Sequence, residues 1–201
     1  MPQITINGVK HEFNKGETIL QVALRAEQEI PHYCWHPGLS VVASCRICLA
    51  EVSTPDPKTG KLMPATKLSP TCQTPAVDGQ VVHTDSPKSV ANQKAVMEYL
   101  LINHPVDCPV CDQAGECHLQ DLAFEHGAAS TRYEFERRTF EKIDIGPYIK
   151  LHMTRCILCY RCVFTANQIT ANLTGTVTGN ATNVSGIVAV ANGGTGASDA
   201  A

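Results

Sequence analysis

The 201-residue chain lacks several features that would place it in common protein classes. It has no run of about eighteen apolar residues, which excludes a membrane-spanning helix. The N-terminus, Met-Pro-Gln-Ile-Thr-Ile, has neither a basic nor an apolar segment, so we expect no secretion signal. The net charge of -3 is spread along the chain and provides no basic surface for nucleic acid. No GxGxxG follows an expected strand, so we expect no nucleotide or flavin site.

Cysteine, in contrast, is abundant: the chain has 10 cysteines, and all of them fall into three groups. Without a secretion signal the thiols are expected to stay reduced, which favours metal ligation over disulfides. We therefore predict a metal protein. The groups are Cys34, Cys45, Cys48 and Cys72; then Cys108, Cys111 and Cys117; then Cys156, Cys159 and Cys162.

The second group has the spacing H-x3-C-x2-C-x5-C when His104 is included. Nearby proline, aspartate and glycine residues oppose regular structure, so this segment is not expected to pack as core. Three cysteines and one histidine suit tetrahedral zinc or a cubane cluster with one unusual ligand. A histidine at a helix end often only meets the helix dipole, but the cysteines behind it favour ligation. Alone, Cys108-x2-Cys111 also fits half a zinc site or a redox pair.

The other two groups also have spacings typical of iron–sulfur proteins. The first is C-x10-C-x2-C, with a fourth cysteine after a further x23. A loop with three cysteines and a fourth from a distant strand is the layout of plant-type [2Fe–2S] ferredoxins, although their first interval is x4. The third, C-x2-C-x2-C, matches the three-ligand loop of a [4Fe–4S] cluster. Zinc seldom needs thiolates so closely spaced, so a cluster is favoured there.

The N-terminal sequence predicts a small α+β unit. Residues 3–13 alternate apolar and polar side chains around an Asn-Gly pair, which predicts a β-hairpin with a type I′ turn. Residues 18–28 predict a helix with a capping box formed by Thr18 and Gln21. A hairpin followed by an amphipathic helix favours packing of the helix on the strands.

Further helices and strands are expected downstream. Residues 77–84 predict a strand after an Asp-Gly turn, and a helix is predicted to begin at Ser86 and to stop before His104. A short helix is predicted over 118–125, with short strands and loops over 131–150. The residues of the longer helix expected to face the core are Val90, Val96, Met97, Leu100 and Leu101.

Taken together, the motifs resemble the N-terminal part of the large iron–sulfur subunit (the G subunit) of NADH-quinone oxidoreductase, respiratory complex I. The stretches that carry this resemblance are 44–52, 104–117 and 155–162. The resemblance covers residues 1 to roughly 170 and implies an α+β architecture. Its domains would be a β-grasp [2Fe–2S] ferredoxin-like domain over 1–85, a small helical and loop His(Cys)3 [4Fe–4S] domain over 86–126, and an incomplete [4Fe–4S] domain of the molybdopterin-oxidoreductase type over 127–170.

The resemblance also implies the ligands of each cluster. It places one [2Fe–2S] cluster on Cys34, Cys45, Cys48 and Cys72, and one [4Fe–4S] cluster on His104, Cys108, Cys111 and Cys117. A second [4Fe–4S] cluster would use Cys156, Cys159 and Cys162 with a fourth cysteine well downstream. The sequence holds no such cysteine, so we expect this third cluster to be absent or substoichiometric. We hypothesise that the gene is truncated or fused.

The implied role is an electron relay, in which electrons from NADH pass through a flavin in a partner subunit and along the clusters towards quinone. The chain would be an electron-transfer subunit of the enzyme without a complete active site of its own. Its implied partners are the flavin/NADH-binding subunit and other peripheral-arm subunits, with no nucleic acid and no direct membrane insertion. It would lie on the cytoplasmic side of the bacterial inner membrane, bound through those partners.

Two alternatives remain. Electron-transfer subunits of NAD-linked hydrogenases and formate dehydrogenases share the first two motifs but typically continue into C-x2-C-x2-C-x3-C-P. Here Ala166 stands four residues past Cys162, which favours complex I. An alternative of another class is a zinc-binding interaction module, which would be colourless and redox-silent.

Residues beside the cysteines could influence the clusters without binding them. Tyr33 and Trp35, beside the first cysteine, are expected to shield the binuclear cluster from water rather than to carry electrons. The imidazole of His104 in place of a thiolate should make the second cluster easier to reduce. Three arginines either raise cluster potentials or are simple surface charge: Arg46, Arg155 and Arg161.

Residues 171–201 differ in composition from the rest of the chain. From Asn172 onward there is no Lys, Arg, Glu, Cys or aromatic residue. This low-complexity sequence resembles the repetitive linkers of phage tail fibres and bacterial surface proteins. It cannot bury enough apolar surface to offset chain entropy, so we predict that it is disordered.

Overall fold

The N-terminal part of the protein is a mixed sheet that begins with a hairpin. The computed structural model describes residues 1–148 and 150–165. Strands β1 (Gln3–Ile6) and β2 (Val9–Glu12) pair in antiparallel register. Between them Asn7 and Gly8 have φ angles of 47° and 84°, the left-handed values that a type I′ turn requires at both positions. The predicted hairpin is confirmed.

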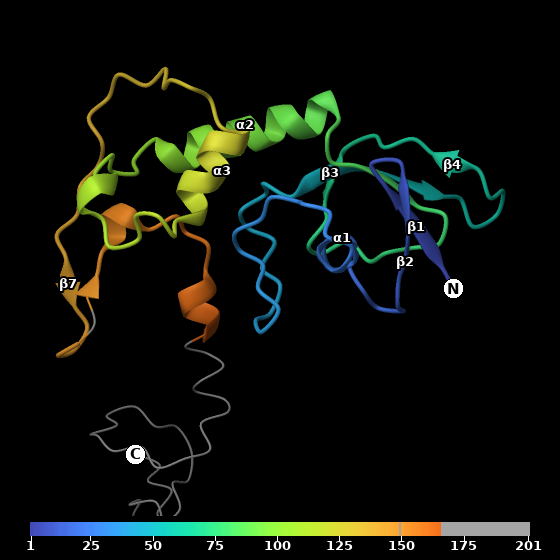
Figure 1. Ribbon diagram of the computed structural model, residues 1–201, viewed down its shortest axis with the longest axis horizontal. Helices are drawn as coiled ribbons and strands as arrows, with labels where there is room; N and C mark the ends of the chain where they lie inside the picture. Colours follow the sequence, from blue (N-terminus) through green and yellow to red (C-terminus); the bar gives the residue numbers. More distant parts are fainter. Residues whose placement is uncertain (149, 166–201) are drawn as a thin grey trace, which may run out of the picture. The chain divides into compact units, whose positions relative to one another are not determined.

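The sheet continues through strands that are distant in sequence, in the order β2-β1-β6-β3-β4, with β5 also paired to β3. Strands β1 and β6 are parallel, and the other neighbours are antiparallel. The further strands are β3 (Leu49–Pro55), β4 (Leu62–Met63), β5 (Leu68–Pro70) and β6 (Val81–His83). Figure 1 shows this sheet at the N-terminal end of the chain.

Strand β6 is shorter than the sequence predicted. The strand was expected over 77–84, but residues 77–80 form a turn in which the Gln80 amide donates to the Val77 carbonyl at 3.1 Å. Gly79 lies in the left-handed region with φ 73°, which breaks the extended conformation. The strand therefore begins only at Val81.

Helix α1 (Ile19–Arg25) packs on the sheet. Its capping box is present: the Gln21 amide donates to Thr18 Oγ1 at 3.4 Å, and the Thr18 amide donates to Gln21 Oε1 at 2.9 Å. The helix is shorter than the predicted 18–28, because Glu27 turns to φ 55°. Its buried face joins the strands in a first hydrophobic core that includes Ile4, Ile6, Phe13, Ile19, Leu20, Val22, Ala23 and Val82. A mixed sheet with one packed helix confirms the α+β prediction.

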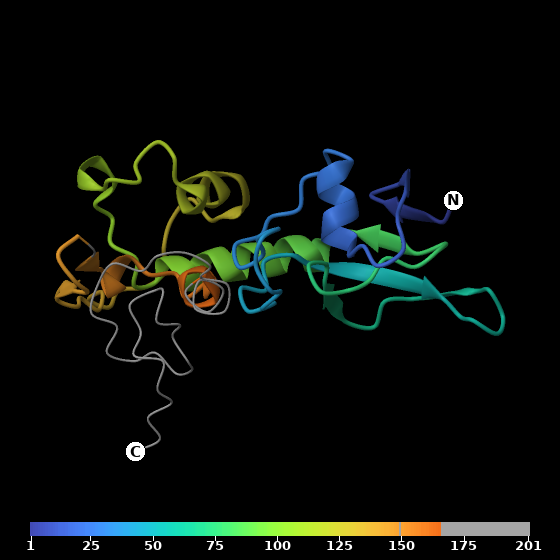
Figure 2. The same ribbon diagram turned by 90° about the horizontal axis from the view of Figure 1, so that it is seen from below.

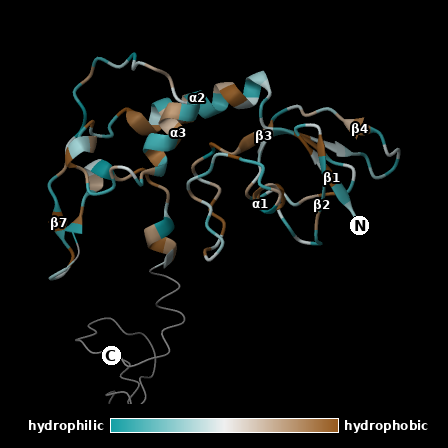
Figure 3. Cartoon of the chain, in the orientation of Figure 1, coloured by the Kyte–Doolittle hydropathy of each residue, from teal (hydrophilic) through white to brown (hydrophobic). Residues whose placement is uncertain are grey.

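Helix α2 (Pro87–Leu101) leads from the sheet to the remaining cysteine loops (Figure 1). Ser86 caps it by accepting a hydrogen bond from the Ser89 amide at 3.3 Å. It ends before His104, as predicted. Figure 3 shows hydrophobic and hydrophilic residues mixed along its length.

Four of the five residues predicted to face the core do so: Met97 is buried in the core that α2 shares with α3, and Val96, Leu100 and Leu101 are partly buried against it. Ser89 and Gln93 are also buried, which the sequence did not predict. The reason is that these polar side chains bond to the end of β6: Ser89 Oγ donates to the His83 carbonyl at 3.1 Å, and Gln93 Nε2 donates to the Thr84 carbonyl at 3.1 Å. Such bonds satisfy carbonyls that the sheet leaves free.

Helix α3 (His118–His126) packs against α2, close to the predicted 118–125. In Figures 1 and 2 the two helices lie side by side. They form a second core with residues from the first cysteine segment, and its fully buried members are Tyr33, Ile47, Met97, Leu119 and Leu122. We call this set the α2–α3 core.

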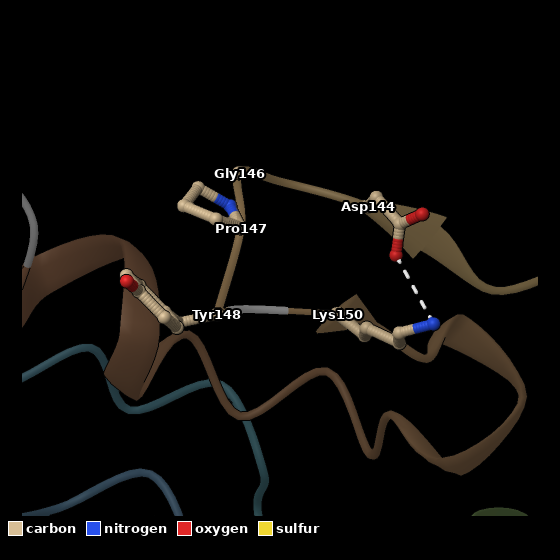
Figure 4. A pocket seen from close by; sticks show the side chains of 5 residues that line it. All are labelled: Asp144, Gly146, Pro147, Tyr148 and Lys150. Carbon is tan, nitrogen blue, oxygen red and sulfur yellow. Dashed lines mark ion pairs between the residues drawn. The ribbon is translucent and has the colours of Figure 1, made fainter.

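The rest of the described chain has little regular structure. It comprises short 3-10 turns at Cys108–Val110 and Met153–Arg155 and a hairpin of β7 (Ile143–Asp144) and β8 (Lys150–Leu151). At the tip of this hairpin a shallow hollow is bordered by an ion pair of 3.3 Å between Asp144 and Lys150 (Figure 4). Within residues 1–148 and 150–165, no helix is long and apolar enough to cross a membrane. The predicted disorder of 171–201 concerns residues outside the described part.

Candidate iron–sulfur sites

The structure brings the four cysteines of the first group together at the edge of the first core. Cys34, Cys48 and Cys72 are buried and Cys45 is half-buried. The thiols of Cys45 and Cys72 both donate to the sulfur of Cys34, and the thiol of Cys72 also donates to Cys48. Residues from three separate segments of the chain therefore converge with their sulfurs in hydrogen-bond contact.

Hydrogen bonds between the thiols shift their pKa values in two directions. The two hydrogen bonds that Cys34 accepts, from Cys45 first and then Cys72, hold its pKa far below that of an ordinary thiol. Donation from Cys72 lowers the pKa of Cys48 to about 6. The two thiols that donate these hydrogen bonds, Cys72 and Cys45, have pKa values raised well above that of an ordinary thiol. The lowered pKa values of Cys34 and Cys48 favour their thiolate form, which is the form that binds metal.

Backbone amides also point at these sulfurs. Cys34 accepts from the amides of Cys45 and Ser44, and Cys45 accepts from the amide of Ile47 among others. The chain reaches this geometry by placing Ala43 and Arg46 in the left-handed region, with φ angles of 53° and 61°. Non-glycine residues rarely adopt this conformation, and turns that contain it form amide-lined concavities for anions. The C-x2-C spacing alone gave no sign of it.

Two further residues fix this loop. Thr71, which is fully buried, donates from Oγ1 to the Cys48 carbonyl at 3.0 Å. The carbonyl of Arg46 accepts a hydrogen bond from Asn92 Nδ2 of α2 at 2.8 Å, while the Arg46 side chain is exposed. Sequence reasoning missed both Thr71 and Asn92, because only the tertiary structure brings them to the loop.

The second group occupies the connection between α2 and α3. Cys108 begins a 3-10 turn, and Cys111 follows it, with its backbone amide donating a hydrogen bond to the Cys108 carbonyl at 3.1 Å. Cys117 is the residue before α3. All three are half-buried. His104 enters from the end of α2, and its Nδ1 is buried with no hydrogen-bond partner among the described residues. A buried imidazole nitrogen without a partner is costly unless it binds something, so this atom fits metal ligation.

In the third group, Cys156 and Cys159 lie on a tight loop after the 3-10 turn Met153–Arg155, and Cys162 lies in the helical residues 161–165 that follow. Leu158 and Tyr160 have left-handed φ angles of 56° and 64°, and the Leu158 amide donates to Cys156 Sγ at 3.4 Å. An amide directed at a cysteine sulfur repeats the arrangement of the first group. Cys156 and Cys162 are exposed, and Cys159 is half-buried.

The donor atoms of the three groups are thiols, with one imidazole in the second group. In the first group, hydrogen bonds link the thiols to one another. A binuclear or cubane cluster takes thiolate ligands on several irons, and the donors present, all thiols apart from one imidazole, fit such a cluster.

One cysteine from each group packs against the α2–α3 core. These are Cys45, Cys117 and Cys159, which are partly buried against it. The core residue Tyr33 is 4% exposed, and its hydroxyl donates to Met97 Sδ at 3.4 Å and to the His118 carbonyl at 3.5 Å. Burial raises the pKa of the Tyr33 hydroxyl. The three cysteine loops therefore share one dry core.

The aromatic residues beside Cys34 are buried, as expected for a shield. Trp35 is 8% exposed and makes an edge contact with His32, with ring centroids 5.6 Å apart. Its carbonyl accepts a hydrogen bond from Arg161 Nη2 at 2.8 Å. This bond joins the third loop to the first.

Comparisons with known families agree with this geometry. Residues 2–87 match the 2Fe-2S iron-sulfur cluster binding domain. Residues 93–132 match the NADH-ubiquinone oxidoreductase-G iron-sulfur binding region. Residues 146–192 match the ferredoxin-like domain of NADH-quinone oxidoreductase subunit 3. This last match extends beyond residue 170, where the resemblance seen in the sequence was expected to end.

Individual proteins match over most of the chain. The G subunit of NADH-quinone oxidoreductase from Rickettsia prowazekii is 41% identical over 169 residues, which are 84% of this chain and 24% of that protein. The same subunit from Yersinia pestis is 40% identical over 81% of this chain and 17% of its own length. The crystal structure of an NAD+-reducing [NiFe]-hydrogenase in the H2-reduced state matches with a TM-score of 0.71 and 29% identity, over 83% of this chain and 66% of that chain.

The fold and the three cysteine groups define an iron–sulfur protein that begins with a [2Fe–2S] ferredoxin-like domain and continues into [4Fe–4S] regions. The chain belongs to the family of the NADH-quinone oxidoreductase G subunit and corresponds to its N-terminal part. It spans about a quarter of the length of the Rickettsia relative.

Proposed function

We propose that the chain holds its clusters through the residues predicted from the sequence. The [2Fe–2S] cluster is bound by Cys34, Cys45, Cys48 and Cys72, and one [4Fe–4S] cluster by His104, Cys108, Cys111 and Cys117. Cys156, Cys159 and Cys162 supply three ligands to a second [4Fe–4S] cluster. The converging thiols of the first group and the unpaired Nδ1 of His104 support these assignments.

We infer that the chain relays electrons from NADH, by way of a flavin-bearing partner subunit, towards quinone. The single observation that carries this proposal is the packing of one cysteine from each group on the α2–α3 core. Bound clusters supply one-electron carriers whose potentials depend on charge, hydrogen bonds and solvent exposure. The chain's own residues hold the three loops at fixed separations and exclude water between them.

The assembly and location follow from the family. We propose that the chain works as one subunit of an oxidoreductase complex, without a complete active site of its own. Its partners would be the flavin/NADH-binding subunit and other peripheral-arm subunits. The family's membership of a membrane complex supports a peripheral position on the cytoplasmic side of the inner membrane.

A second candidate function is electron transfer in an NAD-linked hydrogenase. The match to the NAD+-reducing [NiFe]-hydrogenase chain favours it. However, the third group lies in a region that matches a domain of NADH-quinone oxidoreductase, and both relatives described above are subunits of that enzyme. We therefore place the quinone-linked function first.

The proposal is tested by producing the full chain anaerobically with its native flavin-bearing partner and adding NADH. Reduction of the cluster signals of this chain by NADH, and their reoxidation by a soluble quinone only when the complete complex is present, is the expected result. Reduction by hydrogen with a hydrogenase partner, but not by NADH with the complex I partner, would support the second candidate. Zinc in place of iron and sulfide would leave only a structural role for the cysteines.

A further inference from the structure

Arg155 belongs to the third cysteine group by sequence but reaches the second group in the structure. It ends the 3-10 turn before Cys156, and its Nη2 donates to Asp107 Oδ2 at 2.6 Å. Asp107 directly precedes Cys108. The side chains of Arg155 and Asp107 are only 22% and 37% exposed, so this ion pair is better shielded than an ordinary surface pair.

The surroundings of Arg155 are those of the second group. Its ion-pair partner Asp107 lies between two of the donors of that group, three residues after His104 and directly before Cys108. A pocket between α2 and the third loop is lined by His104 and Cys156 together with Met153 and Ile157, so the two loops lie next to each other.

A second donor atom of Arg155 is shielded from solvent. Its Nε is buried and has no hydrogen-bond partner within the described part of the chain. A guanidinium normally uses all its donors when it is buried. Another charge-paired arginine, Arg132, donates to Glu98 from Nε and Nη2 but is 79% exposed and lies outside the cysteine loops. Arg132 therefore provides a matched control.

We propose that the Arg155–Asp107 ion pair sets the reduction potential of the cluster held by His104, Cys108, Cys111 and Cys117. Arg155 is thus a positioning residue for the second loop, although the sequence assigns it to the third. This inference rests on the proposed function, since it requires a cluster at the second group. Reduction adds one electron to the cluster and makes or breaks no bond. The guanidinium stabilises that added charge and the carboxylate opposes it.

The charges at the two ends of the pair provide a test that separates electrostatics from structure. Arg155→Gln and Asp107→Asn break the same ion pair, but the first removes a positive charge and the second a negative one. A merely structural role predicts shifts of the same sign in both variants. The electrostatic role predicts a lower midpoint potential for Arg155→Gln and a higher one for Asp107→Asn.

The measurement is a redox titration of the full, anaerobically purified chain, with dithionite as reductant and low-temperature EPR of each cluster as readout. Arg155→Lys keeps the charge and should remain closer to the unaltered chain than Arg155→Gln does. Arg132→Gln should leave the potential unchanged. In the metal-free chain, both pair-breaking variants should raise the rate of Cys108 alkylation to a similar extent, because both release the loop.

Opposite shifts of the second cluster, with little change in the binuclear signal, are the expected result. Shifts of the same sign, or none, in chains that keep the cubane signal would overturn the inference and leave the proposed function intact. An unaltered chain that contains iron and sulfide for the binuclear cluster but no cubane signal would overturn the second cluster assignment, and this inference with it.

Discussion

Met97 is the residue whose loss should most affect the core that joins the three cysteine loops. It is fully buried between α2 and α3, and its sulfur accepts the hydrogen bond of Tyr33. Truncation of a buried methionine to alanine typically costs about 2–5 kcal/mol, because apolar contacts are lost and a cavity remains. The lost acceptor for the Tyr33 hydroxyl adds to this, although the His118 carbonyl remains nearby. We expect Met97→Ala to destabilise the chain by about 3 kcal/mol.

The chain offers a matched control in Met63, which is 54% exposed on β4. The same substitution there should cost no more than about 0.5 kcal/mol. The free energy of unfolding of a chain of this size falls by about 2 kcal/mol per molar urea. Met97→Ala should therefore lower the urea concentration at the unfolding midpoint by roughly 1.5 M, and Met63→Ala should hardly change it. Far-UV circular dichroism during urea unfolding measures both. Equal midpoints for the two variants would refute the idea that the α2–α3 core fastens the loops.

Three further substitutions test other parts of the account. Cys72→Ser should abolish the binuclear EPR signal and remove about two irons per chain while the cubane signal persists; retention of the binuclear signal would show that Cys72 is not a ligand. His104→Cys should lower the potential of the second cluster in a redox titration, because a thiolate adds negative charge; an unchanged or higher potential would count against the histidine assignment. Hydrogen bonds from Arg25 and Asn14 lower the pKa of Glu17 below 4.5 in the folded chain. The ionised carboxylate therefore stabilises the fold above that pH, and this stabilisation is lost as the pH falls through the lowered pKa of the folded state. Glu17→Gln should therefore cost about 0.5 kcal/mol at neutral pH and nothing near pH 2, as chemical denaturation at both pH values would show.

Features set by local chemistry were predictable from the sequence. The Asn7-Gly8 turn and the Thr18 capping box depend on residues within three positions of one another, and the structure contains both. The cysteine spacing identified the kind of site for the same reason, because ligands on one loop are close whatever the rest of the fold does. The fourth member of the first group, Cys72, was identified from the family pattern and lies with the others.

Features that depend on distant contacts were not predictable. The apolar stripe of α2 suggested Val90 as a core residue, but the end of β6 requires hydrogen bonds, and Gln93 is buried to supply one. The left-handed conformation of Arg46 has no signature in its residue type, since glycine would be the usual choice. The pairing of Arg155 with Asp107 links residues 48 positions apart, so its role beside the second group appears only in the folded chain.

The central claim is that these cysteines and His104 hold electron-carrying clusters and not zinc. It is tested most directly by low-temperature EPR of the full chain after anaerobic purification and reduction with dithionite, with iron, sulfide and zinc quantified on the same sample. The account predicts a rhombic binuclear signal and a fast-relaxing cubane signal, with about six irons per chain for the first two sites. Zinc without sulfide, and no EPR signal, would contradict it.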